Sequence, residues 1–246
     1  MKGNGSVARL TGDQAAAYWD ERHQKTDPWR AGGDRGLSEQ ANEIFYYVRY
    51  GLLLRMLVRH FGNDRCLWIL DAGCGRGWLT AHLHSLGHNV VGVDQSEAAI
   101  RYARRTCDAT FAVAPLDEFV SDQRFDAVVC MDVLYHITDD EQWQSSIRNL
   151  RRRLRDEGVL IFSGILESET RELGDYVVHR SRADYERVLA GLSLTISASE
   201  PYGVFSPAAW HLCVGQHSSG HSASRSLSAT PARDLSRRDP KTGCGR

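Results

Sequence analysis

The chain has 246 residues, a formal net charge of −1 at pH 7 and 25% charged residues. A charge so close to zero argues against nucleic acid or an anionic membrane as a partner held by bulk electrostatics. The first residues are polar and interrupted by glycine, unlike a signal peptide, and no apolar run is long enough to span a bilayer. Cys66, Cys74 and Cys130 fall in or beside predicted strands, where a small buried thiol is usual. The composition therefore predicts a cytoplasmic protein with reduced cysteines.

Residues 1–62 are predicted to form an N-terminal helical cap. A short helix over Asp13–Lys25 carries Tyr18 and Trp19, and Ser38 is a suitable N-cap for a long helix that ends near His60. The long helix has two apolar stripes, which predicts that it is covered on more than one side. The stripes are Tyr46, Tyr50, Leu54, Leu57 and Phe61, and Phe45, Val48, Leu52 and Met56. Either one stripe packs on the core while aromatic rings of the other face a ligand, or all of these residues are core.

Strands and helices alternate after the cap, over residues 63–215. This rhythm is typical of a parallel sheet covered by helices on both faces. The predicted segments are Cys66–Asp71, a helix to Leu86, Asn89–Val93, a helix Ser96–Arg105, Thr110–Val113, Asp126–Met131, a helix from about Asp140 to Arg155, Gly158–Ser163, a helix Arg182–Leu189, Leu194–Ser199 and Ala209–Val214. The last two strands are close enough in sequence to form an antiparallel hairpin at the sheet edge. Residues 216–246 are rich in serine and arginine, which predicts a disordered tail.

The strand–loop–helix–strand unit over residues 67–94 carries the strongest chemical signal. The first strand ends in Asp71, a loop with Gly73, Gly75 and Gly77 follows, and the next strand ends in Asp94. Glycines let backbone N–H groups approach a ligand closely, and a carboxylate on the second strand can accept hydrogen bonds from both hydroxyls of a ribose. The pattern predicts a site for a ligand that contains a nucleoside.

Asp71-Ala72-Gly73-Cys74-Gly75-Arg76-Gly77, followed by Asp94, resembles the first two motifs of class I S-adenosylmethionine-dependent methyltransferases. The resemblance implies a Rossmann-like α/β fold with a mostly parallel seven-stranded sheet, and S-adenosylmethionine as cofactor. It implies that the glycine turn lies against the methionine part of the cofactor and that Asp94 binds the ribose. The residues predicted in this way to contact the cofactor are Asp71, Gly73, Cys74, Gly75, Gly77, Asp94, Gln95, Leu116, Met131, Trp19 and Arg49.

Arg49 is similar to a cap arginine that pairs with the cofactor's carboxylate in the ubiquinone group, although Arg55 is nearly as well placed. The adenine edge departs from the family pattern. Relatives often carry an acid or amide just after the third strand, whereas this chain has Ala114-Pro115-Leu116 there and Asp117 slightly later. Backbone groups near Leu116, or Asp117 itself, are the expected substitutes.

The stretch from Met131 to Ile137 resembles the fourth-strand motif of ubiquinone-type O-methyltransferases. In part of that family acids before a histidine hold a divalent metal, but here Tyr135 replaces the middle acid between Asp132 and His136. This substitution removes a hard oxygen ligand and predicts that no metal is bound. His136 is interpreted either as a cap of the following helix or as a general base that takes a proton from the acceptor.

The connection from Gly164 to Arg182 is interpreted either as lining the acceptor pocket, as it commonly does in this fold, or as an ordinary exposed loop. Residues predicted to contact the acceptor are Tyr135, Tyr176, His179 and Arg180.

The leading hypothesis is a methyltransferase, active as a monomer or homodimer, that transfers a methyl group to an oxygen or nitrogen of a small molecule. Alternatives are a catalytically silent methyltransferase-like binding or partner module and, less consistent with the glycine spacing, a nicotinamide-dependent oxidoreductase.

Overall fold

The structure, a computed structural model, describes residues 9–203 and 210–218. Its strands are β1 (Trp68–Ala72), β2 (Asn89–Asp94), β3 (Thr110–Val113), β4 (Phe125–Cys130), β5 (Leu154–Ile165), β6 (Arg171–Glu172), β7 (Val178–His179), β8 (Leu194–Pro201) and β9 (Trp210–His217). Its helices are α1 (Gly12–Lys25), α2 (Pro28–Ala31), α3 (Glu39–Phe61), α4 (Trp78–Ser85), α5 (Glu97–Thr106), α6 (Asp140–Arg153) and α7 (Arg182–Ala190), with a 3₁₀ turn η1 (Leu134–His136).

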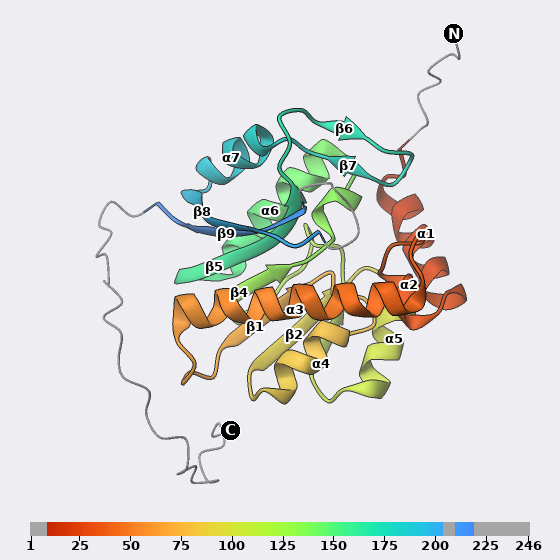
Figure 1. Ribbon diagram of the computed structural model, residues 1–246, viewed down its shortest axis with the longest axis horizontal. Helices are drawn as coiled ribbons and strands as arrows, with labels where there is room; N and C mark the ends of the chain where they lie inside the picture. The colour runs from red at the N-terminus through yellow and green to blue at the C-terminus, as the bar shows by residue number, and fades with distance from the viewer. Residues whose placement is uncertain (1–8, 204–209, 219–246) are drawn as a thin grey trace.

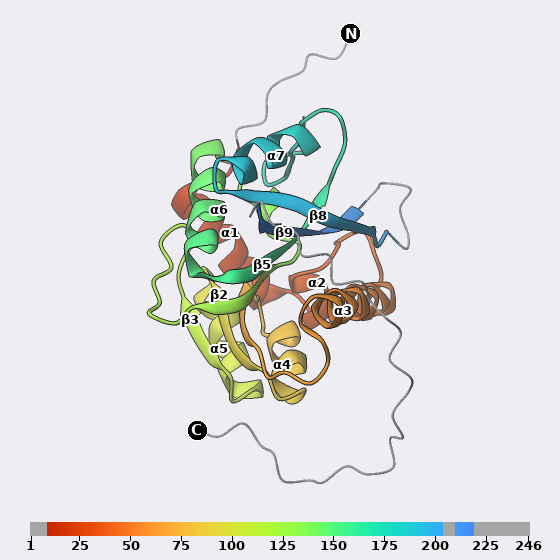
Figure 2. The same cartoon turned by 90° about the vertical axis from the view of Figure 1, so that its left-hand side faces the viewer.

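The main sheet has seven strands in the order β3-β2-β1-β4-β5-β9-β8 (Figure 1). Strands β1 to β5 pair in parallel, and β9 pairs antiparallel with both β5 and β8. Helices α3 and α4 lie on one face of this sheet and α6 on the other (Figure 2). The prediction of a mostly parallel seven-stranded sheet with an antiparallel hairpin at its edge is therefore confirmed.

Local sequence explains where the helices begin. The side chains of Ser38, Ser96, Asp139 and Ser181 each accept a hydrogen bond from a backbone N–H in the first turn of the helix that follows. Strand β4 is buried along its whole length, as expected for a central strand of a parallel sheet. These elements hold the carboxyl ends of β1, β2 and β4 at one edge of the sheet, where an open α/β sheet binds its ligands.

The main differences from the predicted elements are in β5, in β9, at α2 and at the β6–β7 hairpin. Strand β5 begins at Leu154, since Phe125 pairs with it across a bulge, so Arg155 lies in a strand and forms an ion pair with Asp126 instead of ending a helix. Strand β9 extends through His217, so its last residues belong to the sheet and not to the predicted tail. The short helix α2 and the β6–β7 hairpin occupy segments predicted as loops. Residues 219–246 of that tail, and Ala209 of the predicted last strand, lie outside the described residues.

The two halves of helix α3 have different surroundings. Leu53, Met56 and Leu57, in the second half, are buried against the sheet. Tyr46 and Tyr50, in the first half, line a cavity beyond the end of the strands. The division therefore does not follow the two stripes, since Met56 and Leu57 come from different stripes and are both core. That Tyr46 and Tyr50 face a ligand stays a prediction.

Candidate functional site

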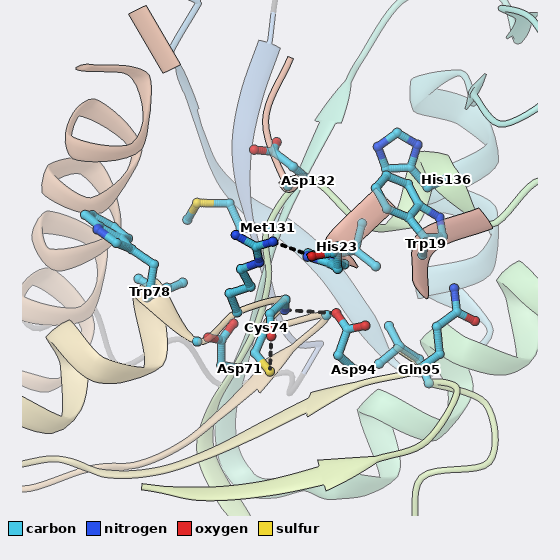
Figure 3. Close-up of a pocket in the computed structure, with 18 of the residues that line it drawn as sticks. Trp19, His23, Asp71, Cys74, Trp78, Asp94, Gln95, Met131, Asp132 and His136 are labelled. Atoms are coloured by element: carbon cyan, nitrogen blue, oxygen red, sulfur yellow. Dashed lines mark hydrogen bonds between the residues drawn. The ribbon is translucent and has the colours of Figure 1, made fainter. Parts of the chain in front are cut away.

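A cavity of about 510 Å³ lies at the carboxyl ends of β1, β2 and β4, a volume typical of small-molecule sites. Every residue predicted to contact the cofactor lines it: Trp19, Arg49, Asp71, Gly73, Cys74, Gly75, Gly77, Asp94, Gln95, Leu116 and Met131. Figure 3 shows Asp94 and Gln95 on the side of the cavity opposite to Trp78. Contact of these residues with a cofactor stays a prediction.

The loop after β1 requires glycine for two separate reasons. Gly73 has φ +81°, and a Cβ there would lie 2.2 Å from Cγ2 of Val133. Gly77 has φ +78°, and a Cβ would lie 2.9 Å from the Cβ of Ala103. Positive φ and close approach are both conditions that favour glycine. The backbone N–H of Gly73 donates to the carbonyl oxygen of Val93 at 2.7 Å, which holds the loop against β2.

Asp71 is buried and Asp94 is half-buried, and both strand-terminal carboxylates are hydrogen-bonded. Asp71 accepts a hydrogen bond from the Thr80 hydroxyl at 2.6 Å. Asp94 accepts from the backbone N–H groups of Gly75 and Ser96, each at 2.9 Å. Burial raises the pKa of both acids, that of Asp71 to about 7. Asp94 therefore ties the glycine loop to the start of α5 and places a carboxylate on the cavity wall.

The raised pKa of Asp71 predicts a pH-dependent stability. An unfolded aspartate has a pKa of about 3.9, so the folded state binds this proton more tightly, and the Asp71 contribution to stability falls as pH rises from about 4 to about 7. Asp71→Asn does not titrate. We expect the free energy of unfolding of D71N, relative to wild type, to rise by about 2–4 kcal/mol across this window in urea denaturation. A difference that is the same at all pH values would contradict the raised pKa.

Helix α1 is held over the cavity by polar contacts, most of which involve backbone atoms. The Asp20 carboxylate accepts from the backbone N–H of Ala98 at 2.7 Å and from the Ser96 hydroxyl at 2.9 Å. The Arg76 guanidinium, from the glycine loop, donates to the carbonyl oxygens of His23 and of Thr26, the latter at 2.9 Å. These contacts bring Trp19 and His23 of α1 into the cavity wall.

Arg49 belongs to a buried network that sequence reasoning did not find. Its guanidinium forms an ion pair with Asp132 and lies over the rings of Phe45 and Tyr46, at 4.3 and 4.5 Å from their centroids. Asp132 also accepts a hydrogen bond from the Tyr202 hydroxyl at 2.7 Å, and its φ is +58°. Nη2 of Arg49 is buried without a hydrogen-bond partner among the described residues, although Arg49 lines the cavity. An anion in the cavity would give this nitrogen a partner.

His136 does not cap the following helix, because the side chain of Asp139 does so. Nδ1 of His136 lies 3.0 Å from the carbonyl oxygen of Tyr176, and the ring packs 4.6 Å from Trp19 and 5.7 Å from the Tyr176 ring. Burial lowers the pKa of His136 to about 3. The ring is therefore neutral at pH 7, with Nδ1–H donating to the Tyr176 carbonyl and Nε2 left as the acceptor.

The residues predicted to contact the acceptor are placed elsewhere: none of Tyr135, Tyr176, His179 and Arg180 lines the cavity. Arg180 is buried, lies 4.4 Å over the Trp143 ring and donates to Asp140 at 2.9 Å, so it anchors β7 to the start of α6. Tyr135 packs edge-on against His179, 5.7 Å between centroids. Tyr176 contacts His136, which lines the cavity, through its carbonyl oxygen. The side chains of this connection support the cavity wall instead of forming it.

Aromatic rings from three helices form a wall that the sequence indicated only in part. Trp78 is the first residue of α4, and its ring lies edge-on to those of Tyr46 (5.3 Å), Tyr50 (5.8 Å) and Trp29 (6.1 Å). All of these rings, together with that of His82, line the cavity. We call Trp29, Tyr46, Tyr50, Trp78 and His82 the aromatic wall. The cavity thus has a polar end at Asp94 and an aromatic side at Trp78.

Comparison with known proteins agrees with this geometry. A model of the methyltransferase domain family matches residues 69–158. The ubiquinone biosynthesis O-methyltransferase of Rickettsia bellii is 28% identical over 142 residues, 56% of each chain, and that of Actinobacillus pleuropneumoniae is 31% identical over 108 residues, 39% of this chain and 45% of the relative. The chain spans about half the length of the curated relatives it matches.

Solved structures resemble the whole fold. Magnesium protoporphyrin IX methyltransferase from Synechocystis, with bound SAM, superposes with a TM-score of 0.65 at 21% identity, over 87% of this chain and 100% of that one. The N-methyltransferase NodS from Bradyrhizobium japonicum, with S-adenosyl-L-homocysteine, gives 0.64 at 21% identity, over 82% and 97%. Residues 69–158 thus match the methyltransferase domain family, and the fold is that of solved class I S-adenosylmethionine-dependent methyltransferases.

Proposed function

We propose that this protein binds S-adenosylmethionine and transfers its methyl group to an oxygen or nitrogen atom of a small molecule. The observation that carries the proposal is the cavity wall itself, where the glycine loop, the Asp94 carboxylate and the unpartnered Nη2 of Arg49 line one space. These groups fit the cofactor's methionine part, ribose hydroxyls and carboxylate. Relatives named as O- and N-methyltransferases of small molecules support the reaction class.

The cofactor supplies an electrophilic methyl group on a positively charged sulfur, which an oxygen or nitrogen nucleophile can displace directly. The residues of the chain therefore have to hold the reactants in line and exclude water. Glycines at positions 73 and 77 keep the floor of the cavity free of side chains. Helix α1, with Trp19 and His23 in the wall, covers it.

His136 serves to orient the acceptor. With its pKa lowered to about 3 by burial, it is too weak a base to retain a proton at neutral pH. Its Nε2 can accept a hydrogen bond from an acceptor O–H or N–H while Nδ1 is fixed by Tyr176. The proton leaves to solvent once the acceptor has reacted.

The aromatic wall favours a flat, apolar acceptor. Rings such as those of Trp29, Trp78 and Tyr50 pack against aromatic ligands edge to face or offset, and each such contact adds about 0.5–1.5 kcal/mol beyond its buried area. A planar aromatic or heteroaromatic compound with a hydroxyl or amino group is therefore the expected substrate class. The proposal includes action as a monomer or homodimer and a cytoplasmic location.

Two assays test the proposal. Calorimetry with S-adenosylhomocysteine should detect one binding site on the purified protein. Incubation with isotopically methyl-labelled cofactor and a panel of phenols, heteroaromatic amines and aliphatic controls should transfer label to members of the aromatic set. The absence of any heat of binding would overturn the cofactor assignment. Binding without transfer to any acceptor would favour the silent module instead.

Arg49 is predicted to hold the cofactor's carboxylate. Arg49→Met should weaken S-adenosylhomocysteine binding by at least about 10-fold, the loss of a charge-assisted hydrogen bond. It should leave the affinity for 5′-methylthioadenosine, which has no carboxylate, unchanged. Arg55→Met is the matched control, since Arg55 lies on the same helix but pairs with Glu200. Equal affinities of wild type and R49M for S-adenosylhomocysteine would remove this role.

A further inference from the structure

Ser146 carries a buried hydroxyl without a hydrogen-bond partner among the described residues. It lies on α6, is 0% exposed, and lines the cavity. A serine inside a helix usually donates to the carbonyl four residues earlier. The adjacent Ser145 does so, to Glu141 at 2.8 Å. A buried hydroxyl left unpaired lowers the stability of the free protein, so a hydroxyl on a cavity wall points to a partner that binds there.

The surroundings of Ser146 place it beside the loop that follows β3. One helical turn before it, the Gln142 amide donates to the Asp117 carboxylate at 3.4 Å. On the turn after it, the Asn149 amide donates to the carbonyl oxygens of Leu116 and Phe119, each at 2.8 Å. These contacts fix α6 against the loop on both sides of Ser146. Leu116, Asp117 and Gln142 line the same cavity.

The side chains of this loop supply no hydrogen-bond donor for a purine ring nitrogen. Ala114 has no polar side chain, and Pro115 has no backbone N–H. Asp117 can accept from an exocyclic amino group but, as a carboxylate, cannot donate to a ring nitrogen. Of the two described α6 residues that line the cavity, Gln142 and Ser146, Ser146 is the one that carries a hydroxyl. Ser146 therefore adds a side-chain donor beside a loop whose other donors are the backbone N–H groups of Leu116 and Asp117.

Resting on the proposed binding of S-adenosylmethionine, we propose that the Ser146 hydroxyl donates a hydrogen bond to a ring nitrogen next to the amino group of the cofactor's adenine, while the Asp117 carboxylate accepts from that amino group. Ser146 is then a specificity residue for adenine supplied by α6. It compensates for the alanine and proline that follow β3.

Ser146→Ala tests this assignment with two measurements that move in opposite directions. The dissociation constant for S-adenosylhomocysteine should rise about 5- to 10-fold, the loss of one hydrogen bond to an adenine nitrogen. The free protein should unfold at the same or a higher urea concentration, since the substitution removes an unpaired buried hydroxyl. Ser145→Ala, the matched control on the exposed side of α6, should leave the dissociation constant unchanged. A less stable free S146A protein with unaltered affinity would assign Ser146 a structural role and overturn the proposal.

Analogues of S-adenosylhomocysteine identify the nitrogen. Replacing N1 or N7 of the adenine by C–H should weaken binding to wild type for one of the two analogues only, and S146A should no longer distinguish that analogue from the parent compound. If S146A keeps the full discrimination against both analogues, the proposal fails. Wild-type protein that does not bind S-adenosylhomocysteine at all would overturn the proposed function; wild-type binding with an unaffected S146A would overturn this inference alone.

Discussion

Asp94→Ala should abolish useful affinity for the cofactor. The variant loses the two proposed hydrogen bonds from ribose hydroxyls to a charged group, each worth about 1.5–3 kcal/mol. It also frees the backbone N–H groups of Gly75 and Ser96. We expect the dissociation constant for S-adenosylhomocysteine to rise at least about 100-fold in calorimetry. The cofactor should also no longer raise the thermal unfolding temperature of D94A.

Two further variants separate the effect on the ligand from the effect on the loop. Asp94→Asn keeps one acceptor oxygen and should lose less affinity than D94A, because part of the loop geometry survives. Asp108→Ala removes an exposed carboxylate after α5 and should bind like wild type. If D94A bound S-adenosylhomocysteine with wild-type affinity, the cavity would not hold a ribose at this position.

Asp132→Asn should strongly destabilise the free protein. Asparagine keeps the shape of the side chain, tolerates the φ of +58°, and can still accept from the Tyr202 hydroxyl. It leaves the Arg49 guanidinium buried without a counter-charge, and breaking a buried pair in this way costs about 3–5 kcal/mol. Urea denaturation of the free protein measures this loss.

The matching rescue variant removes the other member of the pair. In Arg49→Met combined with Asp132→Asn neither charge remains buried, so the double variant should recover most of the stability that D132N loses. Because R49M also removes the predicted carboxylate partner, only stability is compared here. Stability of D132N within about 0.5 kcal/mol of wild type would show that the guanidinium is well solvated in the free protein.

The part of the site formed by residues close together in the sequence could be predicted, because short sequence patterns determine where those residues lie. Asp71, Gly73 and Asp94 are strand ends and a turn, whose positions follow from hydrophobic runs and glycine spacing. The sheet edge then brings the two acids together without further information.

The part that joins distant segments could not be predicted. Arg49, Asp132 and Tyr202 lie in three separate segments, and no local pattern indicates that a helix residue, a residue after β4 and one after β8 meet. Trp78 shows the same limit. The sequence shows it as a bulky residue where a dinucleotide-binding turn has glycine, and only the packing of α3 against α4 reveals it as the centre of the aromatic wall.

The way α1 is fastened bears on how this protein can diverge. Arg76 donates hydrogen bonds to the carbonyl oxygens of residues 23 and 26, and Asp20 accepts one from the N–H of residue 98. These attachments therefore depend on main-chain atoms of the partner residues. Mutational drift in the side chains of the exposed positions of α1 leaves them intact. Among homologues, selection should therefore preserve an arginine in the glycine loop and an acid near the middle of α1. The residues at the exposed positions of α1 should vary freely.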